Sequence, residues 1–284
     1  MSSYTWAPRR WTGKPTCSDL HDGTMTPTFE TVLFTVADDN VATITLNRPE
    51  VLNAFNQRMC EEFAELWSII REDDSIHAVV LRAAGERAFS TGVDVKAPLR
   101  YSTNVWSQAD PGDWLSPKGN RVWKPVVCAV HGMAAGGAFY WINESDIVIC
   151  SPEATFFDPH VSYGLTAVLE PIGLAHRVSL GEALRMALMG LDERVSADKA
   201  LAIGLVTEIV DRAELWERAH QIAAAIAAKP PAAVQGTVRA IWESLDVGRS
   251  AALARGMAYT QIGNPLTEGS VDRSAIATRK FRIR

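Results

Sequence analysis

Apolar and polar residues alternate between positions 30 and 46, in "ETVLFTVADDNVATITL". Two such runs on either side of the turn residues 38–40 are typical of half-buried strands joined in a hairpin. Between positions 56 and 71 the apolar residues recur with the period of a helix instead, which predicts a helix with one apolar face. The residues of that face are Met59, Phe63, Leu66, Trp67 and Ile70.

Farther along, short apolar runs that suit buried strands alternate with helical segments. The predicted strands are "HAVVLRAA", "PVVCAV", "DIVICS", "ATFF" and "GLVTEIV", with an irregular stretch from about 96 to 123. Beyond position 180 the predicted helices are 182–190, 197–203, 212–228, 231–246 and 249–262. This order predicts an α/β fold with a helical C-terminal part. We divide the chain into an N-terminal extension (1–28), an α/β core (29–210) and a helical C-terminal subdomain (211–284).

Composition excludes several classes of partner. The chain of 284 residues has a net charge of -5 and no block of basic residues, so we expect no nucleic-acid binding. No apolar run is long enough to span a membrane, and the first residues lack the apolar segment of a signal peptide. The four cysteines and six histidines are scattered without metal-ligand spacing, so we expect no metal site and a cytoplasmic location.

Two adjacent glycines, Gly136 and Gly137, open the predicted helix in "HGMAAGGAFYWINESD". The first amides of a helix lack partners and attract negative charge. The phosphate-loop patterns are absent, which leaves an oxyanion that develops on a carbonyl during reaction. Such an oxyanion needs a second amide from another segment, and "AFSTGVDVK" offers one, because Gly92 also follows a buried strand. The alternative is that the glycines only permit close packing of helix and strand.

Five segments in order resemble the crotonase family, the enoyl-CoA hydratases and isomerases. They are "NRPEVLNAF" (47–55), "AFSTGVDVK" (88–96), "KPVVCAVHGMAAGGAF" (124–139), "DIVICSPEATF" (146–156) and "RVSADKALAIGLVTEIV" (194–210). The resemblance covers roughly residues 29–284. It implies a spiral of β-β-α units and a C-terminal helical part that forms trimers or hexamers. It also implies an acyl-CoA substrate and no cofactor beyond the coenzyme A of that substrate.

The resemblance assigns the two oxyanion donors to the backbone amides of Val93 and Gly137. It also implies acyl-CoA contacts from the two loops, at Asn53, Ala54, Thr91, Asp94, Val95 and Gly136. Aromatic residues of the irregular stretch, such as Trp114, would wall the acyl pocket, although they suit a packing cluster equally well. Arg279 in the basic tail would meet the phosphates of coenzyme A, unless that tail is only solvated.

Both glutamates that flank the reacting carbons in hydratases of this family are replaced here. Tyr140 stands at the first position and His160 at the second. Because a histidine titrates near neutrality and a tyrosine does not, we interpret His160 as the proton carrier and Tyr140 as a hydrogen-bond or proton donor. Asp158 is a candidate to orient the imidazole and Glu170 to substitute as an acid or base, whereas Glu144 suits a packing or salt-bridge role better.

The sequence therefore predicts an enzyme that stabilises a thioester enolate. Hydration is the family default, while isomerisation, decarboxylation and C–C bond hydrolysis ask less of the missing glutamate pair. A non-catalytic acyl-CoA binder that retained the two-amide cradle is the alternative from another functional class. A scaffold protein of an unrelated α/β fold would have to match all five segments by chance.

Overall fold

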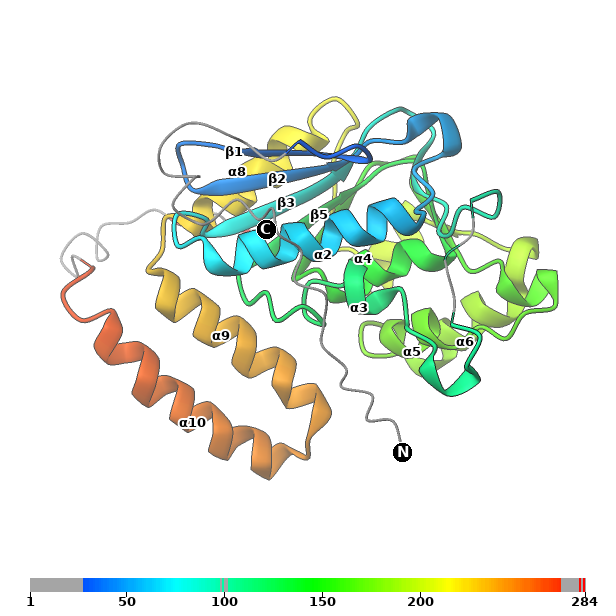
Figure 1. The fold of residues 1–284 in the computed structure, drawn as a ribbon. Helices are drawn as coiled ribbons and strands as arrows, with labels where there is room; N and C mark the ends of the chain where they lie inside the picture. Colours follow the sequence, from blue (N-terminus) through cyan, green and yellow to red (C-terminus); the bar gives the residue numbers. More distant parts are fainter. Residues whose placement is uncertain (1–27, 98, 100–101, 272–280, 282, 284) are drawn as a thin grey trace, which may run out of the picture.

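A computed structural model describes residues 28–97, 99, 102–271, 281 and 283 (Figure 1). Nearly all of the predicted N-terminal extension, and the predicted CoA contact Arg279, lie outside these residues. The fold and the candidate site are therefore described from residue 28 to residue 271.

A six-stranded sheet forms the centre of the fold, in the order β1-β2-β3-β5-β7-β10. Its strands are β1 (Val32–Val36), β2 (Val41–Leu46), β3 (Ala78–Ala83), β5 (Val126–Val130), β7 (Ile147–Cys150) and β10 (Glu208–Ile209). The predicted hairpin pairs β1 with β2 in antiparallel fashion, and all other neighbours in this sheet run parallel. Parallel strands need cover on both faces, and helices supply it here.

A second, smaller sheet holds β4 (Ala88–Ser90), β6 (Met133–Ala135), β8 (Thr155–Phe157) and β9 (Val195–Ser196). Three of these strands follow directly on strands of the large sheet, as β3–β4, β5–β6 and β7–β8. A helix comes after each pair: α3 (Gly112–Leu115), α4 (Phe139–Glu144) and α5 (Leu169–Leu174). The predicted α/β fold of repeated β-β-α units is confirmed.

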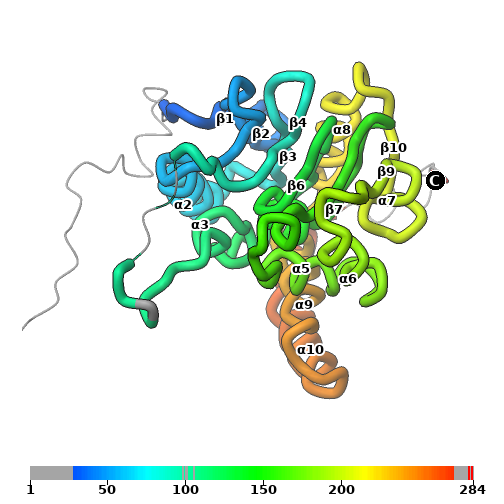
Figure 2. The backbone as a smooth tube through the Cα atoms, turned by 90° about the vertical axis from the view of Figure 1, so that its right-hand side faces the viewer, coloured from blue at the N-terminus to red at the C-terminus, as the bar shows by residue number. Residues whose placement is uncertain are grey.

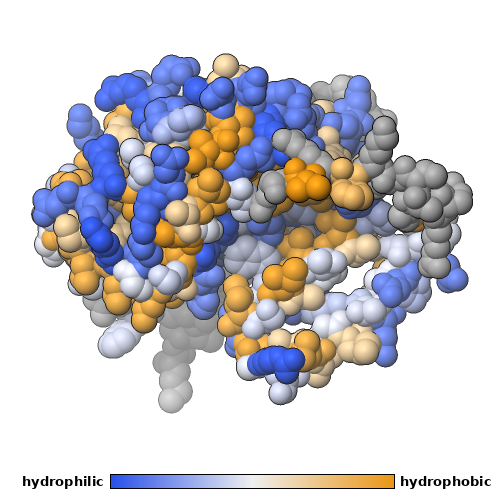
Figure 3. Space-filling view, turned by 180° about the vertical axis from the view of Figure 1, so that it is seen from behind, coloured by the Kyte–Doolittle hydropathy of each residue, from blue (hydrophilic) through white to orange (hydrophobic). Residues whose placement is uncertain are grey.

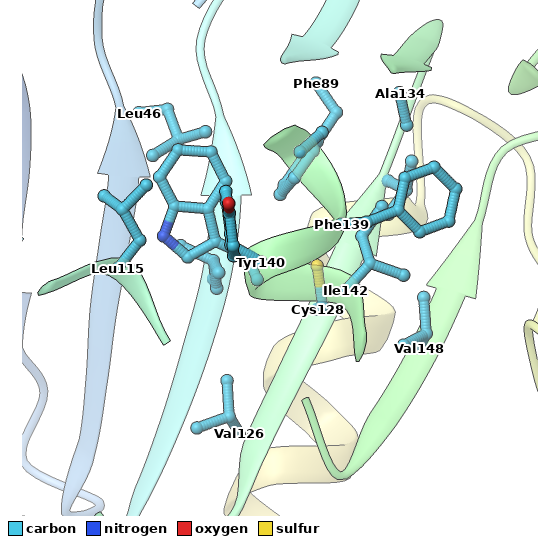
Figure 4. Packing of buried hydrophobic residues seen from close by; sticks show 14 of the residues in the cluster. Leu46, Phe89, Leu115, Val126, Cys128, Ala134, Phe139, Tyr140, Ile142 and Val148 are labelled. Atoms are coloured by element: carbon cyan, nitrogen blue, oxygen red, sulfur yellow. The ribbon is translucent and has the colours of Figure 1, made fainter. Parts of the chain in front are cut away.

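Two apolar clusters hold the large sheet between its helices. Helices α2 (Gln57–Glu72) and α4 lie on one face. The Asn56 side chain caps α2 by accepting a hydrogen bond from the Met59 amide at 3.0 Å. Figure 4 shows Ile142 of α4 close to Cys128 and Val148 of the sheet. On the other face, α8 (Leu215–Ala227) packs small alanine side chains against the strands.

The remaining helices are α6 (Leu180–Met189), α7 (Ala197–Ala202), α9 (Pro231–Glu243) and α10 (Arg249–Leu266). Helices α9 and α10 lie side by side and project from the body in both views (Figures 1 and 2). Neither helix has a buried residue. We call these two helices the arm. Within residues 211–271, the described part of the predicted subdomain, α8 packs on the sheet and the arm stands off from the core.

Candidate active site

Two glycine turns meet in the structure, one after β4 and one after β6. Gly92 has a φ of +83°, and a Cβ added to it would lie 2.8 Å from the Gly137 nitrogen. A Cβ on Gly137 would lie 2.5 Å from Cε1 of Phe55 and 3.4 Å from the Cα of Gly92. No side chain fits into these spaces, so glycine is required at both turns for the backbones to touch.

The hydrogen bonds around Val93 indicate where its amide points. The Phe55 amide donates to the Gly92 carbonyl, and the Asp94 amide donates to the Phe55 carbonyl, each at 2.8 Å. In such a parallel bridge the middle residue, Val93, directs its own N–H away from the partner strand. Gly137 is the second residue of the short helix η3 (Gly136–Ala138), where amides have no acceptor within the helix.

Val93 and Gly137 line the same cavity, which has a volume of about 470 Å³. Among the other residues around it are Tyr140, His160 and Glu170. The five side chains and amides that the sequence analysis names as catalytic thus surround one space. A pocket of this size suits a small substrate.

His160 lies against the glycine turn and is held by Asp158. A Cβ on Gly136 would lie 3.6 Å from the imidazole Cε1. The Asp158 carboxylate binds Nδ1 of His160 at 2.5 Å and accepts from its backbone amide at 3.0 Å. The Asp158 side chain is 3% exposed and that of His160 24%. The hydrogen bond from Asp158 raises the pKa of His160, and it outweighs the opposing effect of burial.

Glu170 contributes a second titratable group from the first turn of α5. The residue is 8% exposed, and the Asn143 side chain donates to its carbonyl oxygen at 2.9 Å. Burial raises the pKa of the Glu170 carboxyl, although the nearby charge of His160 works in the opposite direction. The pKa values of His160 and Glu170 are therefore both raised above their ordinary values.

Tyr140 and Glu144 occupy successive turns of α4 but differ in their surroundings. The Tyr140 ring meets Phe55 edge-on at 6.2 Å between centroids and packs on Gly112, where a Cβ would lie 3.0 Å from Cδ1. Glu144 instead accepts hydrogen bonds from the amides of Lys118 (2.7 Å) and Gly119 (3.0 Å). The Glu144 carboxylate thus holds the backbone at residues 118 and 119, a structural role that the sequence analysis did not specify beyond packing or a salt bridge.

Several residues predicted to contact acyl-CoA do not line the cavity; their hydrogen bonds and ion pairs stabilise the loops instead. Asn53 accepts from the Arg48 amide and donates to the carbonyls of Ala84 and Ala88. Asp94 pairs with Arg48 at 3.0 Å; burial acts to raise the pKa of this carboxyl, but Arg48 and backbone amides lower it overall.

The backbone of the remaining loop residues is also engaged or turned outward. The Ala54 carbonyl accepts from the Arg48 guanidinium, and the Thr91 amide donates to the Leu52 carbonyl. Val95 is 83% exposed. These contacts fix the backbone that carries Val93.

The residues of the irregular stretch (about 96 to 123) that line the cavity differ from the one that the sequence predicts. Trp114 packs against the core and does not line the cavity, whereas Asp110 and Pro111 do. Asp110 accepts from the Gly112 amide at 2.9 Å. Sequence analysis did not single out Asp110, because "ADPGD" indicates a turn but not the direction in which that turn faces. Among the described residues, no cluster of three or more metal-ligating side chains occurs.

The enoyl-CoA hydratase/isomerase family model matches residues 37–261, and the chain belongs to that family, within the crotonase superfamily. It is an enzyme of the hydratase/isomerase type. It is 31% identical over 226 residues to (E)-benzylidenesuccinyl-CoA hydratase of Thauera aromatica, covering 79% of this chain and 86% of that protein. It is 33% identical over 226 residues to short-chain-enoyl-CoA hydratase of Clostridium acetobutylicum, covering 76% and 83%.

A solved structure of an enoyl-CoA hydratase/isomerase from Mycobacterium paratuberculosis superposes with a TM-score of 0.79. The two sequences are 36% identical, and the alignment covers 90% of this chain and 99% of that one. In the part of our chain that the structure describes, no helix combines the length and apolar character needed to cross a membrane.

Proposed function

We propose that this enzyme adds water to, or removes it from, an acyl-CoA thioester through an enolate held by the amides of Val93 and Gly137. The observation that carries the proposal is the contact of the two glycine turns at a cavity that also contains His160 and Glu170. The enolate places negative charge on the thioester oxygen, and each fixed N–H donor stabilises such charge by about 3 kcal/mol.

We propose that His160 and Glu170 replace the two glutamates of the family's hydratases. The Glu170 carboxylate takes a proton from water, and the His160 imidazolium delivers one to the α-carbon. The raised pKa values favour these roles, since a stronger base accepts the water proton and an imidazolium persists at higher pH. Asp158 positions the imidazole through Nδ1, and Tyr140 supplies a hydrogen-bond donor at the same wall.

Two proton carriers favour hydration over the other reactions of the family. Isomerisation needs one carrier that moves a proton between carbons, and decarboxylation needs mainly an oxyanion site and one donor. The relatives named above as hydratases agree with this choice. A relative from Escherichia coli, 33% identical over 200 residues, is a 1,2-epoxyphenylacetyl-CoA isomerase, so isomerisation is the reaction to test beside hydration.

The test compares wild type, His160→Ala and His220→Ala on crotonyl-CoA, with malonyl-type and β-keto thioesters as further substrates. His220 pairs with Asp39 at 2.8 Å on the surface, which makes it a matched control. We expect His160→Ala to lower kcat by about 10²-fold, and His220→Ala to leave it unchanged. Full activity of His160→Ala would contradict its role. Binding of every thioester without turnover would show a non-catalytic binder.

We also propose that the arm mediates assembly into a trimer or hexamer. Its exposed face carries large apolar side chains, and Figure 3 shows apolar groups on this part of the surface and a hollow between it and the body. The exposed apolar side chains of the arm include Ile241, Leu253, Met257, Ile262 and Leu266. Light scattering of the full chain would test this assembly; a monomer at micromolar concentration would contradict it.

We further propose a cytoplasmic enzyme that needs no cofactor besides the coenzyme A of its substrate.

A further inference from the structure

A second cavity, of about 450 Å³, adjoins the first. The two share four lining residues: Asp110, Tyr140, Leu169 and Glu170. A single layer of side chains therefore separates them, with the Tyr140 ring seated on Gly112. The second cavity lies beyond the residues that we place around the reacting carbons, so the far end of a bound acyl group would be directed into it.

Four aromatic rings line the second cavity. Phe139 and Tyr140 line it from α4, Trp123 precedes β5, and Trp242 reaches it from the arm. The Trp242 indole is fixed, because its Nε1 donates to Asp146 at 2.6 Å and the Lys118 ammonium lies 5.6 Å from its ring centroid. Flat, fixed rings favour another ring, through offset or edge-on contacts.

The charged groups of this cavity are mostly acidic, and its cation is already engaged. The Lys118 ammonium is held by Asp146 at 2.8 Å. Glu144 accepts two backbone amides, and Glu243 accepts from Arg239 at 2.7 Å and from the Tyr259 hydroxyl.

Four further carboxylates at this cavity form no ion pair with another residue of the described ranges. They are Asp110, Asp113, Glu170 and Asp246. The field inside the cavity therefore disfavours an anion.

We infer that the second cavity receives the distal part of the acyl group and selects a ring that is uncharged or carries a hydrogen-bond donor. This inference rests on the proposed function, because the first cavity must hold the thioester. A phenolic hydroxyl can donate to a carboxylate of this cavity that forms no ion pair, such as Asp113, whereas an acyl group that ends in a carboxylate meets like charges there. The substrate class is thus an aryl or hydroxyaryl enoyl-CoA, not an anionic one.

Binding of saturated thioesters, which cannot react by hydration, tests the inference independently of turnover. Calorimetry would compare butyryl-CoA, phenylpropanoyl-CoA and the para-hydroxy and para-carboxy derivatives of the latter. We expect phenylpropanoyl-CoA to bind about tenfold more tightly than butyryl-CoA, and the para-hydroxy derivative at least as tightly. The para-carboxy derivative should bind about tenfold more weakly than phenylpropanoyl-CoA.

Two substitutions change this cavity without touching the proposed catalytic groups. Ile172 is 57% exposed and lines only the second cavity of the two, so Ile172→Trp should fill it. We expect a loss of about tenfold in phenylpropanoyl-CoA affinity, with butyryl-CoA binding and crotonyl-CoA turnover unchanged. Leu184→Trp on α6 is the matched exposed control. Asp113→Asn should improve binding of the para-carboxy derivative alone by a few-fold.

The outcomes separate the two proposals. Turnover of crotonyl-CoA without the expected order of affinities, or an unaltered order in Ile172→Trp, would overturn the second-cavity inference and leave the proposed function intact. The expected order of affinities without turnover of any enoyl-CoA would support the cavity and overturn the proposed hydration.

Discussion

The two walls of the first cavity are built in different ways. One wall consists of main chain, where the turns at Gly92 and Gly137 touch and no side chain fits between them. The other consists of side chains from separate segments, with His160 and Glu170 among its titratable groups. Contact of backbones tolerates almost no change, whereas side chains can be exchanged without moving the chain. In the proposed mechanism, the first wall therefore supplies the common step, enolate stabilisation, and the second determines how the proton is transferred.

The largest effect should come from breaking the main-chain wall. In Gly92→Ala the new Cβ would lie 2.8 Å from the Gly137 nitrogen, at a φ of +83° that alanine rarely adopts. We expect kcat on an enoyl-CoA to fall by about 10²- to 10³-fold, as when one oxyanion donor is lost. Gly181→Ala is the control, because a Cβ there meets nothing within 4 Å. A correctly folded Gly92→Ala enzyme with near wild-type kcat would contradict the proposed oxyanion hole.

The next effect should come from Glu170→Gln in the side-chain wall. We expect kcat to fall by about 10²-fold, because glutamine cannot accept the proton of water. Burial raises the pKa of Glu170, so its ionisation opposes folding, and that penalty grows as pH rises from the unfolded pKa through the folded one.

Glu170→Gln removes this penalty, and its Tm should exceed that of the wild type at mildly alkaline pH. The difference should vanish at acid pH, where Glu170 is neutral in both states. Thermal melts across pH would measure it. A variant less stable than the wild type throughout would show that the carboxylate is structural.

The smallest effect should come from Asp158→Asn, which leaves the imidazole in place. The Asp158 hydrogen bond raises the pKa of His160, so its loss should move the corresponding midpoint of the kcat/KM profile to lower pH. This midpoint should shift to lower pH whether His160 acts as acid or base. We also expect kcat to fall by about tenfold. Asp39→Asn, at the surface Asp–His pair, is the control. An unshifted midpoint would mean that His160 is not the group that titrates.

The sequence predicts the main-chain wall better than the side-chain wall. Gly92 and Gly137 come a few residues after β3 and β5, which apolar runs identify, and the glycines themselves mark where the two turns meet. By contrast, the two- and three-residue strands β4, β6 and β9 were not predicted, because pairing with neighbours defines strands so short. Asp110 was missed for a related reason, since the direction of its turn depends on packing against α4.

The placement of α8 shows the same limit. Apolar periodicity predicts α8 as a helix, and the small side chains that face the sheet, such as Ala219 and Ala223, do not tell whether the helix covers that sheet or continues into the arm. The exposure of α9 and α10 likewise has no local signal.

Trp242, near the C-terminal end of α9, ties the arm to the body through Asp146, while its ring lines the second cavity. The same residue thus holds the arm in place and forms part of the lining of the second cavity. If the arm carries the contacts between subunits, a substitution at such a contact that tilts α9 would change the choice of acyl group at a distance. Exchange of the arm between relatives would then transfer substrate preference along with quaternary structure.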